Sequence, residues 1–124
     1  AERILPGATE ANVALFIEKM LADWHTQEER ARFVAGLEDL DARCQRRSRN
    51  RFIDCSETDQ VAVLTELDDE VVAQRKSLGD DRANQHWLAM LKFLTVYGWC
   101  TSEMGMRALR LYPLPSRYDG CAPA

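Results

Sequence analysis

Few side chains in this 124-residue sequence are of the kinds that catalyse reactions or bind metals. It has two histidines, His25 and His86, and four cysteines at positions 44, 55, 100 and 121. The cysteines form no Cys-x-x-Cys pair, and neither histidine lies near a cysteine in sequence, so the spacing of a zinc site is missing. His25 precedes a predicted capping threonine, and His86 stands where a core helix is predicted to begin. Structural roles explain both imidazoles better than catalysis, and we predict no metal site.

Other catalytic patterns are missing as well. The glycines are isolated from one another, so there is no glycine-rich phosphate loop, and no Gly-x-Ser-x-Gly elbow occurs. The acidic run Asp68-Asp69-Glu70 is not a carboxylate pair, because successive residues of a helix point about 100° apart. A solvated helix face explains this run better. We therefore predict no catalytic and no cofactor-binding residue in this chain.

The four cysteines bear on the redox environment. They permit three disulfide pairings, and the sequence does not choose among them. Pairing Cys44 with Cys55 and Cys100 with Cys121 is the simplest arrangement, because each bond would close a single connection. The alternative is four buried free thiols in a cytosolic protein, since cysteine is among the most buried residue types. The even count, with two cysteines in apparent loop or tail positions, favours disulfides and an oxidising compartment.

Length and charge describe an ordinary globular domain. Hydrophobic residues make up 46% of the chain and charged residues 29%, and the net charge is −4. A chain of this size can fold around one core. The arginines between positions 43 and 51 cluster, but one short basic patch in an acidic chain is poor evidence for nucleic-acid binding. We predict a solvated helix end there and no nucleic-acid partner.

The stretch from Trp87 to Trp99 is apolar at nearly every position, with interruptions only at Lys92, Thr95 and Gly98. It is shorter than the roughly 18 apolar residues of a membrane span, and a lysine lies in its middle. We predict a central core helix and no membrane span. A helix that is apolar on every side must be surrounded. Its cover is either the chain's other helices or another protein.

Apolar spacing of the helical type recurs through the rest of the chain and predicts an all-α fold. Thr26 and Glu29 match a capping box, and Ser56 matches a helix N-cap. We expect Trp24, Val34, Leu37, Val61 and Val72 to face inward with the other apolar residues of their helices, and Phe52 and Ile53 to tuck a loop against the core. The prediction is one bundle-like domain over 1–124 with four to five helices: extended 1–8, helices about 9–24, 26–48, 56–76, 84–101 and 102–110, and an extended tail 111–124.

The C-terminal tail mixes aromatic residues, prolines and a paired arginine and aspartate. Such a segment has no room for a core of its own and is ordered only when it lies on something else. Aromatic and arginine side chains are favoured anchors of protein interfaces. Our interface candidates are Trp99, Tyr112, Arg117 and Tyr118. The alternative is a tail held against its own domain by a disulfide.

Several segments match a known family across nearly the whole chain. They are Phe16 to Trp24, Glu28 to Phe33, Tyr97-Gly98-Trp99, Thr101-Ser102-Glu103-Met104-Gly105, and Pro113 to Cys121 with its Arg-Tyr-Asp-Gly-Cys ending. By these residues the sequence resembles the gluconate 2-dehydrogenase subunit 3 family.

The resemblance implies a non-catalytic small subunit that binds, stabilises and helps export a large FAD-dependent dehydrogenase. That partner would be of the glucose–methanol–choline type and act on sugars, glycosides or sugar acids such as gluconate. The FAD would belong to the partner, and a cytochrome c subunit commonly takes the electrons. Small subunits of this kind often bear a twin-arginine leader, so the resemblance implies a periplasmic chain whose leader has been removed.

Two other readings come from different functional classes. One is a free-standing helical module of the periplasm that binds a ligand or another protein. The other is a cytosolic enzyme that uses His86 or a free cysteine, which the sequence supports least.

Overall fold

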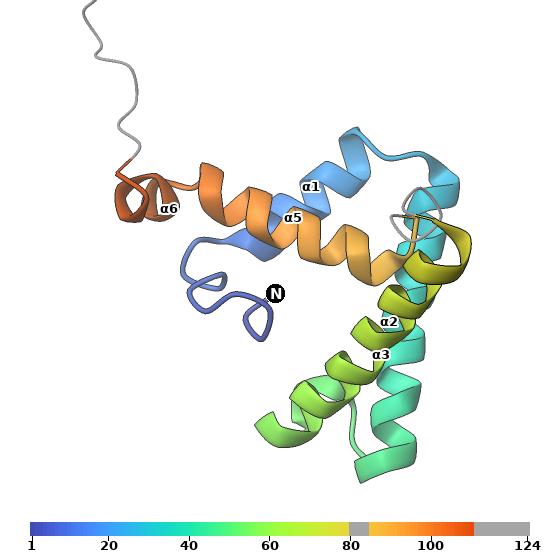
Figure 1. Cartoon of the computed structure of the whole chain (residues 1–124). Coiled ribbons are helices and arrows are strands. Elements are labelled where there is room, and N and C mark those ends of the chain that lie inside the picture. The colour runs from blue at the N-terminus through green and yellow to red at the C-terminus, as the bar shows by residue number, and fades with distance from the viewer. Residues whose placement is uncertain (80–84, 111–124) are drawn as a thin grey trace, which may run out of the picture.

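A computed structural model of the chain describes residues 1–79 and 85–110 (Figure 1). These residues form five α-helices and one short 3-10 helix, and no strand occurs among them, which confirms the predicted all-α fold. The elements are α1 (Val13–Asp23), α2 (Gln27–Ser48), η1 (Phe52–Asp54), α3 (Glu57–Leu78), α5 (Trp87–Thr101) and α6 (Glu103–Ala108). The predicted tail from 111 to 124 lies outside the described residues.

The two long helices begin at the predicted caps. The Thr26 hydroxyl accepts a hydrogen bond from the Glu29 backbone N–H, and the Glu29 carboxylate accepts one from the Thr26 backbone N–H. At α3 the Ser56 hydroxyl accepts from the Asp59 backbone N–H. Each cap satisfies amide groups that have no partner inside the first turn of a helix. The sequence therefore predicts the starts of α2 and α3 to within one residue.

The N-terminal segment differs from its predicted extended form and is a series of turns up to Asn12. The Glu2 carboxylate accepts hydrogen bonds from the Gly7 and Thr9 backbone N–H groups, at 2.9 and 2.8 Å, and these bonds lower its pKa to about 2. Asn12 then adopts a left-handed conformation with φ 53°, so α1 starts at Val13 rather than near residue 9. Local side-chain bonds thus replace the first helical turn that spacing alone predicts.

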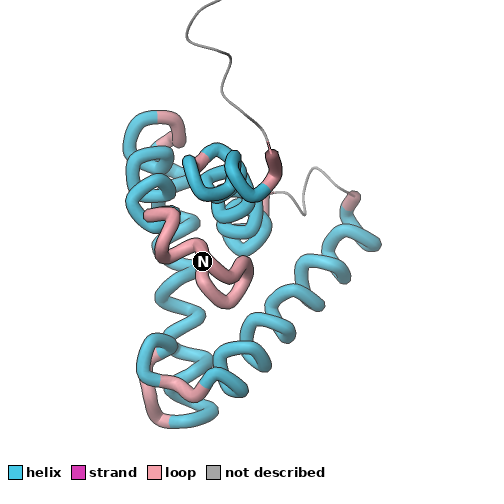
Figure 2. Tube along the Cα trace, turned by 90° about the vertical axis from the view of Figure 1, so that its left-hand side faces the viewer, coloured by secondary structure: helices cyan, strands magenta, loops and turns pink. Residues whose placement is uncertain are grey.

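The helix α5 is at the centre of the arrangement and contacts α1, α2, α3 and α6. Figure 2 shows α2 and α3 close together at the η1 turn and diverging away from it. The largest fully buried side chains come from four helices, α5 included: Val13, Cys44, Val63, Leu67, Leu88, Leu94 and Thr95. The core is therefore assembled by α5, not within any one hairpin.

Several apolar residues that were expected to face inward are exposed. Trp24 is 79% exposed because α1 ends at Asp23 and Trp24 is its C-cap, beyond the buried stripe. On η1, Ile53 is also 79% exposed while Phe52 is partly buried against the core. On the long helices α2 and α3, the exposed ones are Val34, Leu37, Val61 and Val72. These helices bury only a narrow stripe each, because they diverge instead of packing along their full length.

Candidate protein interface

The helix α5 has two apolar faces, and the fold covers only one of them. Its buried face consists of Trp87, Leu88, Leu91, Leu94, Thr95 and Gly98. The opposite side carries Ala89, Phe93, Val96, Tyr97 and Cys100, at spacings of three and four residues that place them on one stripe. Phe93 is 64% exposed, and Val96 and Tyr97 are each 48% exposed. We call Phe93, Val96 and Tyr97 the outer α5 face.

The aromatic rings of this face are held in place by neighbours. The rings of Phe93 and Tyr97 stack with centroids 5.8 Å apart and planes 12° apart, and Tyr97 also lies 5.9 Å from the ring of Phe16 on α1. Gly98 allows this arrangement, because a Cβ there would lie 2.5 Å from Phe16 Cδ1. Phe16 is half-buried against the core and supports Tyr97 from the side. The outer α5 face is therefore ordered without any partner.

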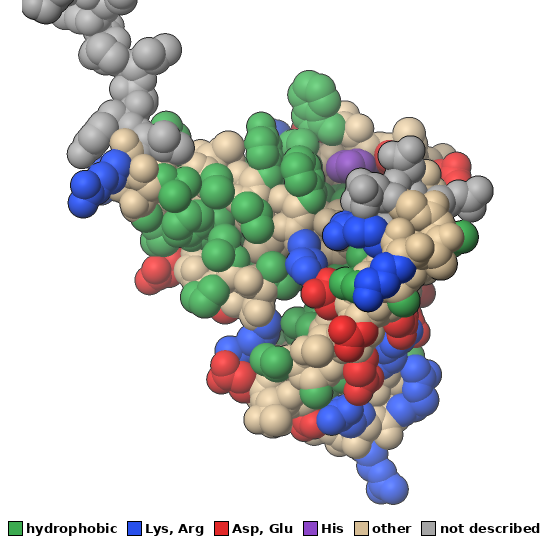
Figure 3. Space-filling model, in the orientation of Figure 1, with side chains coloured by type: hydrophobic (Ala, Val, Ile, Leu, Met, Phe, Trp, Pro, Cys, Tyr) green, Lys and Arg blue, Asp and Glu red, His purple; other side chains and the backbone are tan. Residues whose placement is uncertain are grey.

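The short helix α6 extends the apolar surface. Its first turn is capped by the Ser102 hydroxyl, which accepts a hydrogen bond from the Gly105 backbone N–H at 3.0 Å. Met104 on α6 and Leu109 just after it are both partly exposed. Figure 3 shows hydrophobic side chains gathered where α5 and α6 run, whereas charged side chains dominate the part formed by α2 and α3. The surface is thus divided into an apolar region and a charged one.

The charged region holds the two long helices together. Arg43 on α2 bonds both Asp39 on its own helix and Glu70 on α3, while Arg47 bonds Asp59 and Glu66 on the α3 side. Of the arginines clustered between positions 43 and 51, which were predicted to be a solvated helix end, Arg43, Arg47 and Arg51 thus have carboxylate partners. The ion pairs of Arg43 and Arg47 join α2 to α3, and they pair both arginines with carboxylates of the same chain.

The residues named from sequence for an interface have different positions. Trp99 is half-buried against the core, and its indole Nε1 is buried beside Gly7 of the N-terminal turns. Tyr112, Arg117 and Tyr118 lie outside the described residues. Sequence reasoning expected exposed apolar residues on this helix without naming Phe93, Val96 or Tyr97. Their spacing places them half a helical turn away from the buried residues of α5. This spacing is the sequence feature that could have identified them.

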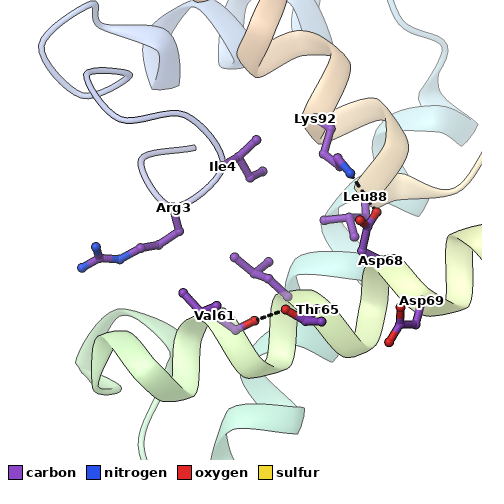
Figure 4. A pocket seen from close by; sticks show the side chains of 9 residues that line it. Arg3, Ile4, Val61, Thr65, Asp68, Asp69, Leu88 and Lys92 are labelled. Carbon is purple, nitrogen blue, oxygen red and sulfur yellow. Dashed lines mark hydrogen bonds and ion pairs between the residues drawn. The ribbon is translucent and has the colours of Figure 1, made fainter.

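Two of the hollows lie beside residues 1–9 of the N-terminal segment. The first, of about 260 Å³, lies between that segment, α3 and α5 (Figure 4), and the Lys92 Nζ–Asp68 ion pair at 2.8 Å crosses its wall. The second, of about 510 Å³, shares residues Arg3, Ile4 and Leu64 with it and is lined mainly by apolar side chains. No histidine, cysteine or serine is among the described residues that line either hollow. Acidic, basic and apolar side chains are among the residues that line each of them.

Both histidines have structural contacts. The His86 Nδ1 atom accepts a hydrogen bond from the Leu88 backbone N–H at 3.1 Å and so caps α5, and burial lowers the His86 pKa. The His25 Nδ1 atom lies 3.4 Å from the Glu29 carboxylate beside the cap of α2. Across residues 1–79 and 85–110, no three histidine, cysteine or acidic side chains are grouped as metal ligands. No helix within these residues is long and apolar enough to span a bilayer.

The cysteines of the predicted disulfides are partly brought together. Cys44 and Cys55 are buried neighbours, and both sulfurs are thiols in this structure. Cys100 is a half-buried thiol on the outward side of α5. Cys121 lies outside the described residues, so the Cys100–Cys121 pairing stays a prediction.

Comparison with known families gives a match over nearly the whole chain. A family model described as gluconate 2-dehydrogenase subunit 3 covers residues 1–114. This chain belongs to that family. The comparisons with curated proteins and with solved structures gave no match. Membership of the gluconate 2-dehydrogenase subunit 3 family makes the chain a small subunit of a dehydrogenase complex, and it confirms the resemblance seen in the sequence.

Proposed function

We propose that this chain is a non-catalytic accessory subunit that binds and stabilises a large FAD-dependent dehydrogenase and helps to export it. The observation that carries the proposal is the outer α5 face, an ordered apolar surface on a member of a small-subunit family. The partner would be of the glucose–methanol–choline type and act on sugars, glycosides or sugar acids such as gluconate. It would hold the FAD, and a cytochrome c subunit would take the electrons.

The energetics of the outer α5 face support a permanent contact. Burial of apolar surface contributes about 25 cal/mol per Å², and aromatic side chains bury more of it than any others. The rings of Phe93 and Tyr97 are already fixed by stacking, so covering them costs little side-chain entropy. Obligate interfaces resemble a domain core cut in half, and a helix that is apolar on both sides has that character.

The occupant that we infer for this face is the catalytic subunit, not a second copy of this chain. Members of this family are subunits of a dehydrogenase complex, so another subunit is the expected neighbour. The charged side chains of α2 and α3 are mostly satisfied within the chain, by Arg43 and Arg47 among others. The apolar region around α5 and α6 is therefore the surface whose burial by a partner would be most favourable.

Export and location follow from the same proposal. An accessory subunit that carries a twin-arginine leader brings its folded partner across the membrane, and the mature pair then lies in the periplasm with the leader removed. Membership of a small-subunit family of a dehydrogenase complex supports this proposal. Co-purification of the tagged chain from a periplasmic fraction, with identification of the partner, tests the location directly.

The interface is tested by coexpressing this chain, tagged, with its flavoprotein partner. We expect Phe93→Ser and Tyr97→Ser each to lower the recovered complex and its exported activity about ten-fold or more, as loss of an aromatic anchor does. Ile53→Ser is the matched control, because Ile53 is at least as exposed but lies on the η1 turn. Circular dichroism of each variant checks that it folds. A complex that survives both α5 substitutions would place the interface elsewhere.

The C-terminal tail is proposed as a second part of the same interface. Replacing Tyr112, Arg117 or Tyr118 by alanine is expected to cost at least ~1 kcal/mol of association if each is an anchor. Recovery of the complex with each substitution, and with the tail deleted after residue 111, measures this. A stable exported complex without the tail would show that only α5 and α6 are needed.

The alternative function is a free-standing module that binds a small apolar ligand. The hollow of about 510 Å³ favours it, because Leu37, Leu40, Phe52, Leu64 and Leu91 are among its lining residues. A ligand module is stable and monomeric by itself, and its Leu64→Ser variant would lose the ligand. An accessory subunit self-associates when its partner is missing, so sedimentation of the isolated chain separates the two functions.

A further inference from the structure

Two cysteines that are apart in sequence meet at the end of the α2–α3 pair. Cys44 lies in the last turns of α2, and Cys55 directly follows η1. The Ser48 hydroxyl lies 3.0 Å from the Cys55 sulfur and donates a hydrogen bond to the Cys44 carbonyl oxygen at 3.1 Å. Cys55 is also a neighbour of Cys44 that contributes, after burial, to the raised pKa of the Cys44 thiol. The fold therefore places both sulfurs in one small volume.

The surroundings of this pair favour a bond between the sulfurs. Both cysteines belong to the buried core, with 0% of Cys44 and 9% of Cys55 exposed. Burial raises the pKa of the Cys44 thiol to about 11, so in the folded chain this group is a poor nucleophile and a poor metal ligand. The Cys55 thiol contacts the Ser48 hydroxyl and the Asn50 carbonyl oxygen, and a disulfide, which needs no hydrogen-bond partner, also fits this core position.

We propose that Cys44 and Cys55 form a disulfide that ties the end of α2 to the start of α3. The oxidant is a disulfide-bearing oxidoreductase or a small-molecule disulfide. The Cys55 thiolate attacks one sulfur of the oxidant and releases its first thiol. The Cys44 thiolate then attacks the Cys55 sulfur of the mixed disulfide and releases the second thiol. Both cysteines are oxidised, the oxidant's disulfide is reduced to two thiols, and the protons of Cys44 and Cys55 go to these.

The position of the pair sets when the bond can form. Cys44 is fully buried in the folded chain, so an oxidant reaches it only before the core closes. The bond therefore forms during folding and is then shielded from reductants. It closes the loop 45–54, which holds four of the clustered arginines and η1. In the chain-entropy description, closing such a loop stabilises the fold by restricting the unfolded chain.

Peptide mapping of the full chain, taken from an oxidising compartment with any bound partner, tests the bond. Free thiols are alkylated first, and the unreduced chain is then digested with trypsin. Cleavage after arginine and lysine places Cys44 in 44–46, Cys55 in 52–75, Cys100 in 93–107 and Cys121 in 118–124. We expect peptide 44–46 linked to 52–75. Alkylated Cys44 and Cys55, or a link from either to another cysteine, would overturn the proposal.

Variants provide a second measurement. The double variant Cys44→Ala/Cys55→Ala is made in the Cys100→Ala background, which also removes the other predicted bond, and refolding it with or without reductant should give the same melting temperature. The unsubstituted chain and the matched control Cys100→Ala should melt about 5–15 °C lower after refolding in reductant. An equal response of all three chains would contradict the proposal. The peptide map reports on this chain alone, so its result on the disulfide holds even if the proposed partner is wrong. It also tests the disulfide if the double variant fails to fold.

Discussion

At the scale of single residues, Gly36 has the tightest side-chain contact of the glycines in the described chain. It lies on α2 under the indole of Trp87, and a Cβ at this position would overlap the indole ring. Phe33 meets the same indole edge-on, with ring centroids 6.4 Å apart. The contact of Trp87 with Gly36 and Phe33 fixes the first turn of α5 on α2. The packing of Trp87 on α2 therefore requires glycine at position 36.

Gly36→Ala tests this requirement. Alanine favours a helix over glycine by about 1 kcal/mol, but here it forces Trp87 to move, and overpacking costs about 1–3 kcal/mol. We expect a net loss in the free energy of unfolding in urea, together with a changed near-ultraviolet spectrum. The control is Ala35→Gly at the neighbouring exposed position, which changes helix propensity alone and should leave that spectrum unchanged. Equal spectra for the two variants would contradict the assigned contact.

Residue roles that depend on local sequence were predictable, and those that depend on distant contacts were not. Thr26, Ser56 and His86 were assigned to helix starts because caps act over two or three residues. Nothing in the sequence distinguishes Gly36 from any other isolated glycine, since its partner Trp87 is far along the chain. Cys44 and Cys55 lie between these two cases. The even number of cysteines suggested their pairing, but only the fold brings the two residues together.

At the scale of elements, the start of α5 depends on an imidazole. His86 accepts the Leu88 amide hydrogen through Nδ1, which requires a neutral ring. Burial, the largest effect, lowers the His86 pKa, and Arg43 also lowers it, while Glu70 and Asp39 raise it. The charged ring is therefore less favourable in the folded chain than in the unfolded one.

The sign of the pH effect follows from this shift. The pKa of His86 is lower in the folded chain than its value of about 6.5 in the unfolded chain. At a pH between these two pKa values the unfolded chain therefore binds more protons. Stability from His86 is thus complete above about pH 6.5 and falls as pH drops through the folded pKa. Asparagine is also a helix cap but does not titrate in this range. In the variant His86→Asn, the melting temperature should therefore depend less on pH between pH 8 and pH 5. His25→Asn is the control and should retain the slope; loss of the slope there would contradict the assignment.

Elements followed their predicted bounds where caps mark them and deviated where a turn intervenes. The starts of α2 and α3 are each one residue from the prediction, while α1 starts late because of Asn12 and the Glu2 bonds. The inward stripes were overestimated on α2 and α3, where Val34, Val61 and others are exposed. Periodicity shows which residues share a helix face, but how much of that face is buried depends on the angle between helices.

At the scale of the whole molecule, apolar and charged surfaces are separated. The apolar region follows α5 and α6, where hydrophobic side chains gather (Figure 3), and most of the ion pairs involve α2 or α3. Sequence predicted the all-α fold because helical spacing is a local property. It could not say which side of α5 stays uncovered, since both sides of that helix are apolar in sequence and only the arrangement of the other helices decides.

This separation predicts how the chain behaves alone. Without its partner, the full chain should self-associate through the outer α5 face, and more strongly in high salt, because the contact is apolar. Phe93→Ser should shift sedimentation-velocity profiles toward monomer at equal concentration, and Ile53→Ser should not. Monomeric behaviour of the unsubstituted chain at high concentration would argue against an uncovered docking surface.

The pairing of α1 with α5 has a consequence for the order of folding. These two helices pack together although α2 and α3 lie between them in the chain, so their contact closes a long loop. The α2–α3 pair is local and can form early, whereas Val13 and Ile17 on α1 have no cover until α5 arrives. On the ribosome, α1 emerges before α2 and α3 yet meets its packing partner α5 only after both of them. Among the described helices α1 is thus made first but becomes native late, and a chain interrupted before Trp87 would leave it exposed to chaperones and proteases.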